Sequence, residues 1–134
     1  MRLSLAYPPS TNRLWRNVRG RTVLSAEAIA WKHAAAWQAR ARGCPQLAGP
    51  VAVEVILHPR LTKTGQASQI RLDVDGPIKI ALDALQGVAY ANDKQVVRLL
   101  ATIGEAQPEG GLTVGVWPAW PWGGKAEATR EARP

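Results

Sequence analysis

The 134-residue sequence contains one cysteine, two histidines and no long apolar segment. Cys44 has no second cysteine to pair with inside the chain, so an intramolecular disulfide is excluded. His58 has no second histidine or cysteine at ligand spacing, which argues against a zinc site. The longest uncharged run, residues 110–124, is too short to cross a membrane and is broken by two prolines. The first residues lack the apolar core of a signal peptide, so we expect a reduced, cytoplasmic protein without a membrane segment.

Acidic residues are scarce in the first half of the chain. Residues 1–72 carry eleven lysines and arginines against two glutamates, a net charge of +9. Residues 73–134 carry six basic and eight acidic residues, a net charge of −2. A general solubility charge would explain the excess, but the asymmetry favours a polyanion held next to bound cations. We therefore expect nucleic acid to be the partner.

The length and composition indicate one domain with a buried core, because 46% hydrophobic and 20% charged residues are typical of a small globular protein. Residues 51–57 alternate apolar side chains and form the clearest strand. Ser25 is a suitable N-cap for an alanine-rich helix that starts with Glu27 in its first turn and ends near Arg42, before Gly43.

The other expected elements complete a single layer of strands with helices. They are a strand at 2–6, a polar loop at 10–21, a brief strand at 22–24, a basic loop at 58–70, a helix at 77–86, and strands at 95–103 and 112–117 that form a terminal hairpin. This order predicts an α+β fold in which two main helices pack against a small mixed β-sheet. We expect residues 118–134 to be a flexible C-terminal tail.

The most informative segment is Arg-Leu-Asp-Val-Asp-Gly-Pro-Ile-Lys at residues 71–79. Asp73 and Asp75 point the same way if the backbone that leads into this segment is extended. Gly76 and Pro77 then open a helix, because proline is tolerated in a first helical turn. Lys79 follows one turn after Asp75. Carboxylates on one edge with a lysine beside them suit a hard divalent cation and a phosphate, as in a metal-dependent phosphodiesterase.

Asp93 supplies a third carboxylate near the first two. Two unit charges 4 Å apart repel by ~4 kcal/mol at an effective dielectric of 20, so an empty cluster would weaken the fold. Bound Mg²⁺ or Mn²⁺ removes that conflict. Alternatively, Asp75 only caps the helix and Asp93 only sits in a turn with Asn92. The combination with Lys79 and the basic half favours the metal site.

Lys79 and Asp83 each have a functional and a structural interpretation. Lys79 either holds the phosphate and stabilises developing charge, or pairs with Asp75 or Asp83 on the helix surface for ~0.3 kcal/mol. Asp83, two turns beyond Asp75, either faces the site or has a structural role, as a partner of Lys79 or a buried cap. The loop at residues 13–21 carries four arginines around Trp15. It is either solvated or contacts phosphates, with the tryptophan stacking on a base or wedging between bases.

Four short motifs, in order and at natural spacing, resemble the RusA family of Holliday-junction resolvases. They are Pro-Pro-Ser-Thr-Asn-Arg at residues 8–13 followed by Arg16, Asp73-x-Asp75 followed by Lys79, Asp-Ala-Leu at residues 83–85 followed by Gly87, and Asn-Asp-Lys-Gln-Val at residues 92–96. The resemblance covers about residues 3–117. One position departs from it: the family usually has asparagine directly after the second aspartate, where this chain has Gly76. The change puts the level of activity in doubt, because a lost amide weakens the ordering of Asp75 or a phosphate contact.

The resemblance implies a homodimeric, Mg²⁺-dependent endonuclease that nicks two opposed strands of a four-way DNA junction, in DNA recombination and repair. Mn²⁺ is expected to substitute for Mg²⁺. Such proteins are often carried by phages and prophages. Residues 1–117 would form the endonuclease domain. Asp73, Asp75 and Asp93 would ligate the metal, and Lys79 would be the catalytic lysine. The residues expected to contact DNA are Asn12, Arg13, Arg16, Arg19, Arg21 and Arg71.

Two other classes of function remain open from the sequence. One is a catalytically weak or inactive protein that binds branched DNA, and Gly76 is the feature that favours it. The other is an RNA-binding or assembly module in which the acidic cluster is incidental. Stabilisation by divalent cations separates the metal-dependent nuclease from the second of these.

Overall fold

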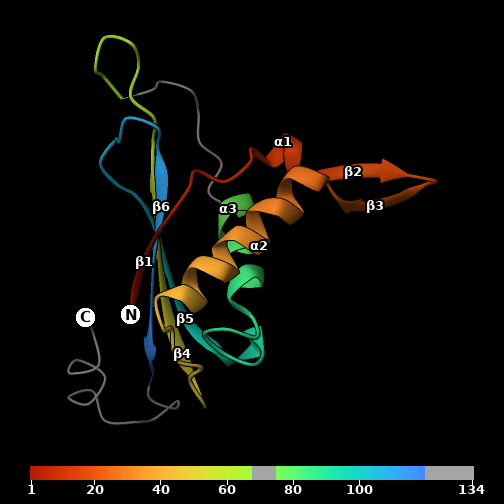
Figure 1. Ribbon diagram of the computed structural model, residues 1–134, viewed down its shortest axis with the longest axis vertical. Coiled ribbons are helices and arrows are strands. Elements are labelled where there is room, and N and C mark those ends of the chain that lie inside the picture. The colour runs from red at the N-terminus through yellow and green to blue at the C-terminus, as the bar shows by residue number, and fades with distance from the viewer. Residues whose placement is uncertain (68–74, 120–134) are drawn as a thin grey trace.

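The computed structural model describes residues 1–67 and 75–119 (Figure 1). Residues 68–74 and 120–134 lie outside the described part, and so do the side chains of Thr11, Asn12 and Asp75. Two of the predicted site residues, Arg71 and Asp73, therefore fall outside it. The same holds for nearly all of the predicted C-terminal tail.

Four strands form the main sheet, in the spatial order β1 (Arg2–Leu5), β6 (Gly111–Pro118), β4 (Val51–His58) and β5 (Val96–Ile103). β5 runs parallel to β4, whereas β6 is antiparallel to both β1 and β4. The sheet is therefore mixed, as predicted. β4 lies between β6 and β5, is apolar at nearly every position and is largely buried.

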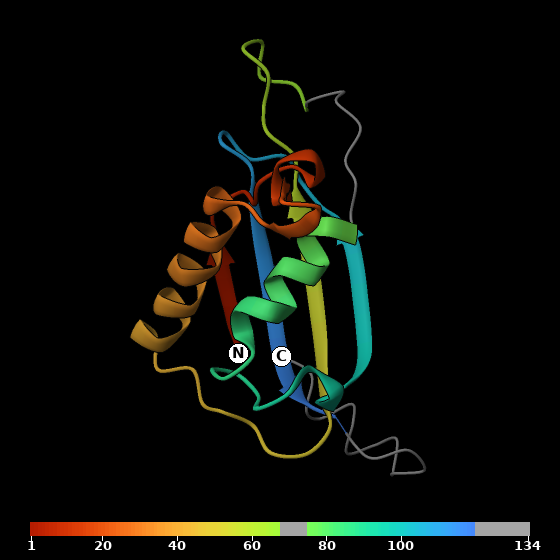
Figure 2. The ribbon, with the colours of Figure 1, turned by 90° about the vertical axis from the view of Figure 1, so that its right-hand side faces the viewer.

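Two helices, α2 (Ala26–Ala41) and α3 (Asp75–Leu85), cover one face of this sheet (Figure 2). The core between the layers joins alternate residues of β4 to the inner faces of the helices. α2 contributes Ala28, Ala35 and Ala39, small side chains that allow close packing, and α3 contributes Ile80 and Leu85. This arrangement confirms the predicted α+β fold with two main helices. No helix in the described part of the chain is long and apolar enough to span a bilayer.

α2 begins and ends where the sequence predicts. The Ser25 hydroxyl caps the helix by accepting a hydrogen bond from the Ala28 backbone N–H at 3.1 Å. Glu27 lies in the first turn and Arg40 in the last, so both charges complement the helix dipole. Gly43 follows the helix with a φ of 74°, a conformation that glycine adopts without strain.

The predicted terminal hairpin between the last two strands is wrong. β5 and β6 do not pair with each other, because β4 lies between them. The intervening residues 104–110 cross the end of β4 instead, where the Gly104 N–H donates to Leu57 O at 2.9 Å and the Gln107 N–H to Pro59 O at 2.8 Å. A nearly continuous apolar run is typical of a strand inside a sheet, and β4 has that position because β5 and β6 flank it.

Residues 10–21, predicted as a polar loop, are ordered elements. They form the short helix α1 (Thr11–Leu14), the strand β2 (Trp15–Val18) and the turn into β3 (Arg21–Leu24). β2 and β3 pair as a separate two-stranded ribbon that projects from the helix layer (Figure 1). Its two-residue turn, Arg19 and Gly20, has positive φ at both positions, as type I′ hairpins require. The brief strand expected at 22–24 is thus confirmed as part of β3.

α3 begins at Asp75, two residues earlier than predicted. The backbone at Asp75 is already helical, and the extended approach considered for Asp73 and Asp75 lies at residues 73–74, outside the described part. Pro77 still lies in the first turn, which tolerates its missing N–H. Lys79 therefore remains one helical turn after Asp75, and Asp83 one turn after Lys79.

Candidate active site

Three of the predicted site residues meet at one open cavity of about 360 Å³. Lys79 and Asp83 come from α3, where their spacing of four residues places them on the same side of the helix. Asp93 comes from the 3₁₀ turn η1 (Asp93–Gln95) that precedes β5. The other lining residues are Ile78, Leu82 and Leu99. The cavity thus combines two carboxylates and an ammonium group with an apolar wall.

Lys79 is exposed, and it makes no ion pair with Asp83. The ion pairs among the described residues join Arg2 to Glu54 and Arg13 to Glu27. The structural interpretation of Lys79 as the partner of Asp83 is therefore not what the structure has. Its side chain is exposed and lines the cavity. The other pairing considered for it, with Asp75, involves a side chain outside the described part.

Asp93 is positioned through its backbone, and its carboxylate takes no part in the turn. The Asn92 side chain accepts from the Lys94 N–H at 2.8 Å, and Gln95 Oε1 accepts from the Asn92 N–H at 3.1 Å, which forms a capping box. The Asp93 N–H donates to Gln86 Oε1 at 3.1 Å, which joins the turn to the end of α3. Among the described residues, no hydrogen bond or ion pair reaches the Asp93 carboxylate. Asp93 thus lies in a turn with Asn92, as the structural interpretation expected, and Asn92 and Gln95 supply the capping side chains.

Tyr90 lies close to the two carboxylates and responds to the field that they create. Its ring is fully buried, and its hydroxyl donates to Leu82 O at 2.7 Å. Burial raises the pKa of Tyr90 well above its usual value, and the negative charges of Asp93 and Asp83 raise this pKa further. The negative charges of Asp93 and Asp83 therefore act on the same buried hydroxyl group.

The remaining predicted metal ligands cannot be placed. Asp73 lies outside the described residues, and for Asp75 only the backbone position in the first turn of α3 is known. The described residues by themselves contain no group of three metal-ligating side chains. The predicted three-carboxylate site therefore stays a prediction, of which Asp93 is the described part.

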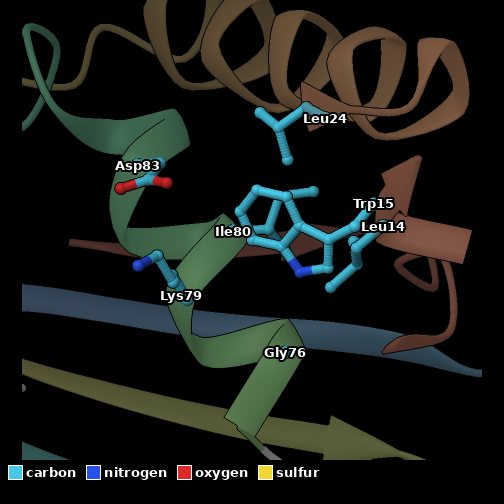
Figure 3. A pocket seen from close by; sticks show the side chains of 7 residues that line it. All are labelled: Leu14, Trp15, Leu24, Gly76, Lys79, Ile80 and Asp83. Atoms are coloured by element: carbon cyan, nitrogen blue, oxygen red, sulfur yellow. The ribbon is translucent and has the colours of Figure 1, made fainter. Parts of the chain in front are cut away.

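A second cavity of about 210 Å³ lies between this site and the ribbon (Figure 3). Lys79 and Asp83 line both cavities, and Figure 3 shows Trp15 pointing towards Ile80 of α3. Gly76, the position that departs from the family pattern, also lines the second cavity. Trp15 lines this cavity and keeps 42% of its surface exposed.

The ribbon separates its arginines from Trp15. The pairs Arg16–Val23 and Val18–Arg21 in the β2–β3 register place Arg16 and Arg21 on one face. Trp15 and its partner Leu24 lie on the other face, towards the cavity. Arg19 forms the tip, and all three arginines of the ribbon are exposed. The ribbon therefore presents positive charge to solvent. Arg13, just before it, is also exposed and lies 4.0 Å from Glu27.

A third cavity, of about 440 Å³, lies between α2 and α3 and was not predicted from the sequence. Its α2 side carries Lys32, His33 and Arg40 around Trp37, which has 71% of its surface exposed. Asp83 lines this cavity too, so it borders all three cavities. The available signal was the helical spacing of Trp37 with the basic residues, which puts an aromatic side chain within a polar stripe.

Comparison with known proteins gives a family match. The sequence profile of the family described as endodeoxyribonuclease RusA matches residues 6–116, which is most of the chain. No curated protein matches the sequence.

Proposed function

The chain belongs to the RusA family of endodeoxyribonucleases, and we propose on that basis that it is a Mg²⁺-dependent enzyme that resolves four-way DNA junctions by paired symmetric nicks. The family implies a junction-resolving endonuclease; the metal, the paired nicks and a role in recombination and repair are parts of the proposal. The observation that carries it is the grouping of Lys79, Asp83 and Asp93 around one cavity. We further propose that the enzyme acts in the cytoplasm as a homodimer.

The proposed metal ligands are Asp73, Asp75 and Asp93. Carboxylate oxygens are the ligands that Mg²⁺ and Mn²⁺ prefer, and the Asp93 carboxylate beside a second acid fits such an ion. When bound, the ion would supply a water of lowered pKa and neutralise charge on the phosphate. Asp83 would add to the negative field, and Gln86 would hold the Asp93 backbone in place through its 3.1 Å hydrogen bond.

Lys79 would act directly on the reacting phosphate. Its ammonium group is exposed at the cavity and does not pair with Asp83, so it can donate to a phosphate oxygen. A fixed positive charge of this kind stabilises the additional negative charge of the transition state more than that of the substrate. Because the side chain is covalently part of α3, it stays in the site when the product leaves.

Two basic surfaces next to the site would hold the DNA. The first is the outer face and tip of the ribbon, with Arg16, Arg19 and Arg21. The second is the α2 side of the third cavity, where exposed Trp37 lies among basic residues and offers a face for base stacking. The α2 surface borders the third cavity, which Asp83 lines. The ribbon borders the second cavity through its opposite face, with Trp15 and Leu24, so its arginines would contact DNA arms beside the site.

The alternative function is binding of branched DNA without efficient cleavage. Gly76 favours it, because this residue replaces the usual asparagine next to Asp75 and lines the cavity that Lys79 shares. The basic surfaces would serve such a protein equally well. The two functions differ only in what happens to the DNA when a divalent cation is added.

A labelled synthetic four-way junction tests the proposal. We expect wild-type protein to nick two opposed strands with Mg²⁺ or Mn²⁺ and to bind without cleavage in EDTA. Asp73→Asn and Asp93→Asn should bind the junction and lose cleavage. The matched control is Glu109→Gln, which removes an exposed carboxylate in the loop between β5 and β6 and should leave both binding and cleavage unchanged.

Two results would change this account. Tight binding without any nicking by the wild type would establish the alternative function. Unchanged cleavage by Asp93→Asn would remove Asp93 from the site.

A further inference from the structure

β5 forms one edge of the main sheet and is unusually apolar for an exposed strand. In the described part of the chain it pairs with β4 alone (Figure 2). Four of its eight residues are large hydrophobic side chains with about half of their surface exposed: Val97 58%, Leu99 45%, Leu100 47% and Ile103 53%. Its only charged residue is Arg98. A long, apolar, unpaired edge is a template for another strand.

The opposite edge of the sheet, formed by β1, is short and partly covered by a helix. β1 is only four residues long, and α2 lies along it. The Trp31 indole donates to Ala6 O at 3.1 Å, and the Gln38 amide donates to Ser4 O. Side chains of α2 thus satisfy backbone groups at the β1 edge. Neither α2 nor α3 extends over β5, which lies beyond α3 in Figure 2.

We propose that β5 is the dimer interface, where it pairs antiparallel with β5 of a second copy of this chain. The inference rests on the homodimer of the proposed function but not on the chemistry of the site. A second copy fits this edge because a two-fold axis pairs a strand with itself, apolar residue to apolar residue. The two main sheets then join into one continuous sheet.

The side chains favour a particular register. Residues that oppose each other directly in an antiparallel pair lie on the same face of the sheet, so a two-fold axis perpendicular to the sheet passes beside one residue. An axis beside Leu100 makes the two copies of Leu100 direct neighbours and sets Leu99 opposite Ala101 of the second copy. Arg98 then faces Thr102 of the second copy, so the two Arg98 side chains are kept apart. Val97 and Ile103 pair with each other at the two ends.

The proposed interface would lie next to the candidate active site. Leu99 lines the cavity of Lys79, Asp83 and Asp93, so the cavity borders the β5 edge. Pairing through β5 would bring the cavities of both copies to the same face of the joined sheet, one on each side of the axis. Two sites related by a two-fold axis are what symmetric nicking of opposed strands needs.

The first test is the mass of the protein in solution by sedimentation, over a wide range of concentration. Leu100→Lys adds a charge at the proposed axis and should raise the dimer dissociation constant by about thirtyfold or more. The matched control is Ile29→Lys, at a residue of α2 with a similar exposure of 42%, which should leave the dimer intact. Both positions are partly solvated, so neither change should unfold the chain. Wild-type protein that is monomeric throughout would overturn the homodimer itself, whereas a dimer that persists in Leu100→Lys would overturn only the interface.

The second test fixes the register by disulfide formation, in a Cys44→Ala background that removes the one natural thiol. Direct neighbours across antiparallel strands have Cα atoms about 4.5–5.5 Å apart, within the ~4.4–6.8 Å range of disulfides. Leu100→Cys should therefore give a covalent dimer on mild oxidation. Thr102→Cys should not, because its two copies would be about 13 Å apart along the strands. A dimeric protein that cross-links through neither residue, or equally through both, would contradict the proposed pairing.

Discussion

The role proposed for Lys79 depends on its charge not being neutralised by Asp83. Asp83 lies one turn away at a spacing that often forms an ion pair, yet the two side chains are not paired. The lysine instead lines two cavities with its charge exposed. An ammonium group that Asp83 does not neutralise is suited to an incoming phosphate.

We predict that Lys79→Met lowers the single-turnover rate of junction cleavage by about 10²–10³-fold, because one stabilising contact to the developing charge is lost. Junction affinity should change little, since the basic surfaces that hold the DNA are elsewhere. Rapid-quench cleavage and a binding titration measure the two quantities. Lys63→Met, in the exposed loop before residue 68, is the control. Equal loss of cleavage in both variants, or loss of affinity alone in Lys79→Met, would contradict a catalytic role.

Gln95 is the residue that fixes the position of the Asp93 turn. Its Oε1 accepts from the Ala91 and Asn92 N–H groups, and its Nε2 donates to Leu47 O and Gly49 O at 2.9 and 2.8 Å. The two bonds to Oε1 hold the turn itself, and the two from Nε2 join it to the segment that precedes β4. The carboxylate of Asp93 therefore depends on Gln95 for its place beside α3.

We predict that Gln95→Ala lowers the free energy of unfolding by on the order of 2–4 kcal/mol, because its four hydrogen bonds are lost. Urea denaturation measures the change. Gln46→Ala, at an exposed glutamine, should have little effect. A similar loss of stability in Gln46→Ala would show that Gln95 has no special role.

At the scale of elements, the ribbon of β2 and β3 is the feature that most changes the interpretation of the basic half. Its register gathers Arg16 and Arg21 on one face, away from Trp15. A paired ribbon holds these charges at fixed positions, whereas a loop would spread them. DNA contacts from this face are therefore expected to be ordered phosphate contacts that position the substrate.

We predict that the double change Arg16→Ala/Arg21→Ala makes the salt dependence of junction binding less steep. Each lost phosphate contact reduces the slope of log affinity against log salt by about 0.9, so the pair should reduce it by about 1.8. Affinity measured at several salt concentrations gives the slope. Arg42→Ala, at the opposite end of α2 from the ribbon, provides the comparison. An unchanged slope in the double variant would show that the ribbon does not contact the DNA backbone.

Local patterns predicted the elements more reliably than their pairing. The apolar alternation of residues 51–57 identified β4, and the Ser25 cap with Gly43 identified both ends of α2. The hairpin of β5 and β6 was wrong because strand order depends on contacts between distant residues, here the burial of β4 on both edges. The ribbon was missed because its turn requires positive φ at Arg19, a residue that rarely adopts it. α3 begins two residues earlier than predicted because the sequence specifies helix ends only weakly.

The site likewise contains some residues that local motifs predicted and others whose roles depend on how distant elements meet. The order of motifs along the chain predicted that Lys79 and Asp93 share a site and left the role of Asp83 open, and the structure brings all three to one cavity. Asp73 and the Asp75 side chain stay predictions. Gln86 and Trp37 could not be assigned from the sequence, because their roles follow from the way α3 meets the Asp93 turn and α2. Residues that position others carry no motif of their own.

At the scale of the whole molecule, the fold brings basic residues from the first half of the sequence close to acidic residues from the second half. Several basic residues of the first half lie on the ribbon and α2, and Asp83 and Asp93 of the second half lie on α3 and in the turn before β5. The fold brings the two halves together around Asp83. A polyanion held by the first half would therefore meet a cation held by the second.

The most direct test of this account is a calorimetric titration of Mn²⁺ into the protein without DNA. The wild type should bind the ion saturably, and Asp93→Asn should bind it at least about tenfold more weakly, because a ligand is lost. Glu109→Gln, which removes a carboxylate that does not line the cavity, should match the wild type. Equal affinity of the wild type and Asp93→Asn, or no binding by the wild type, would contradict a metal site that includes Asp93.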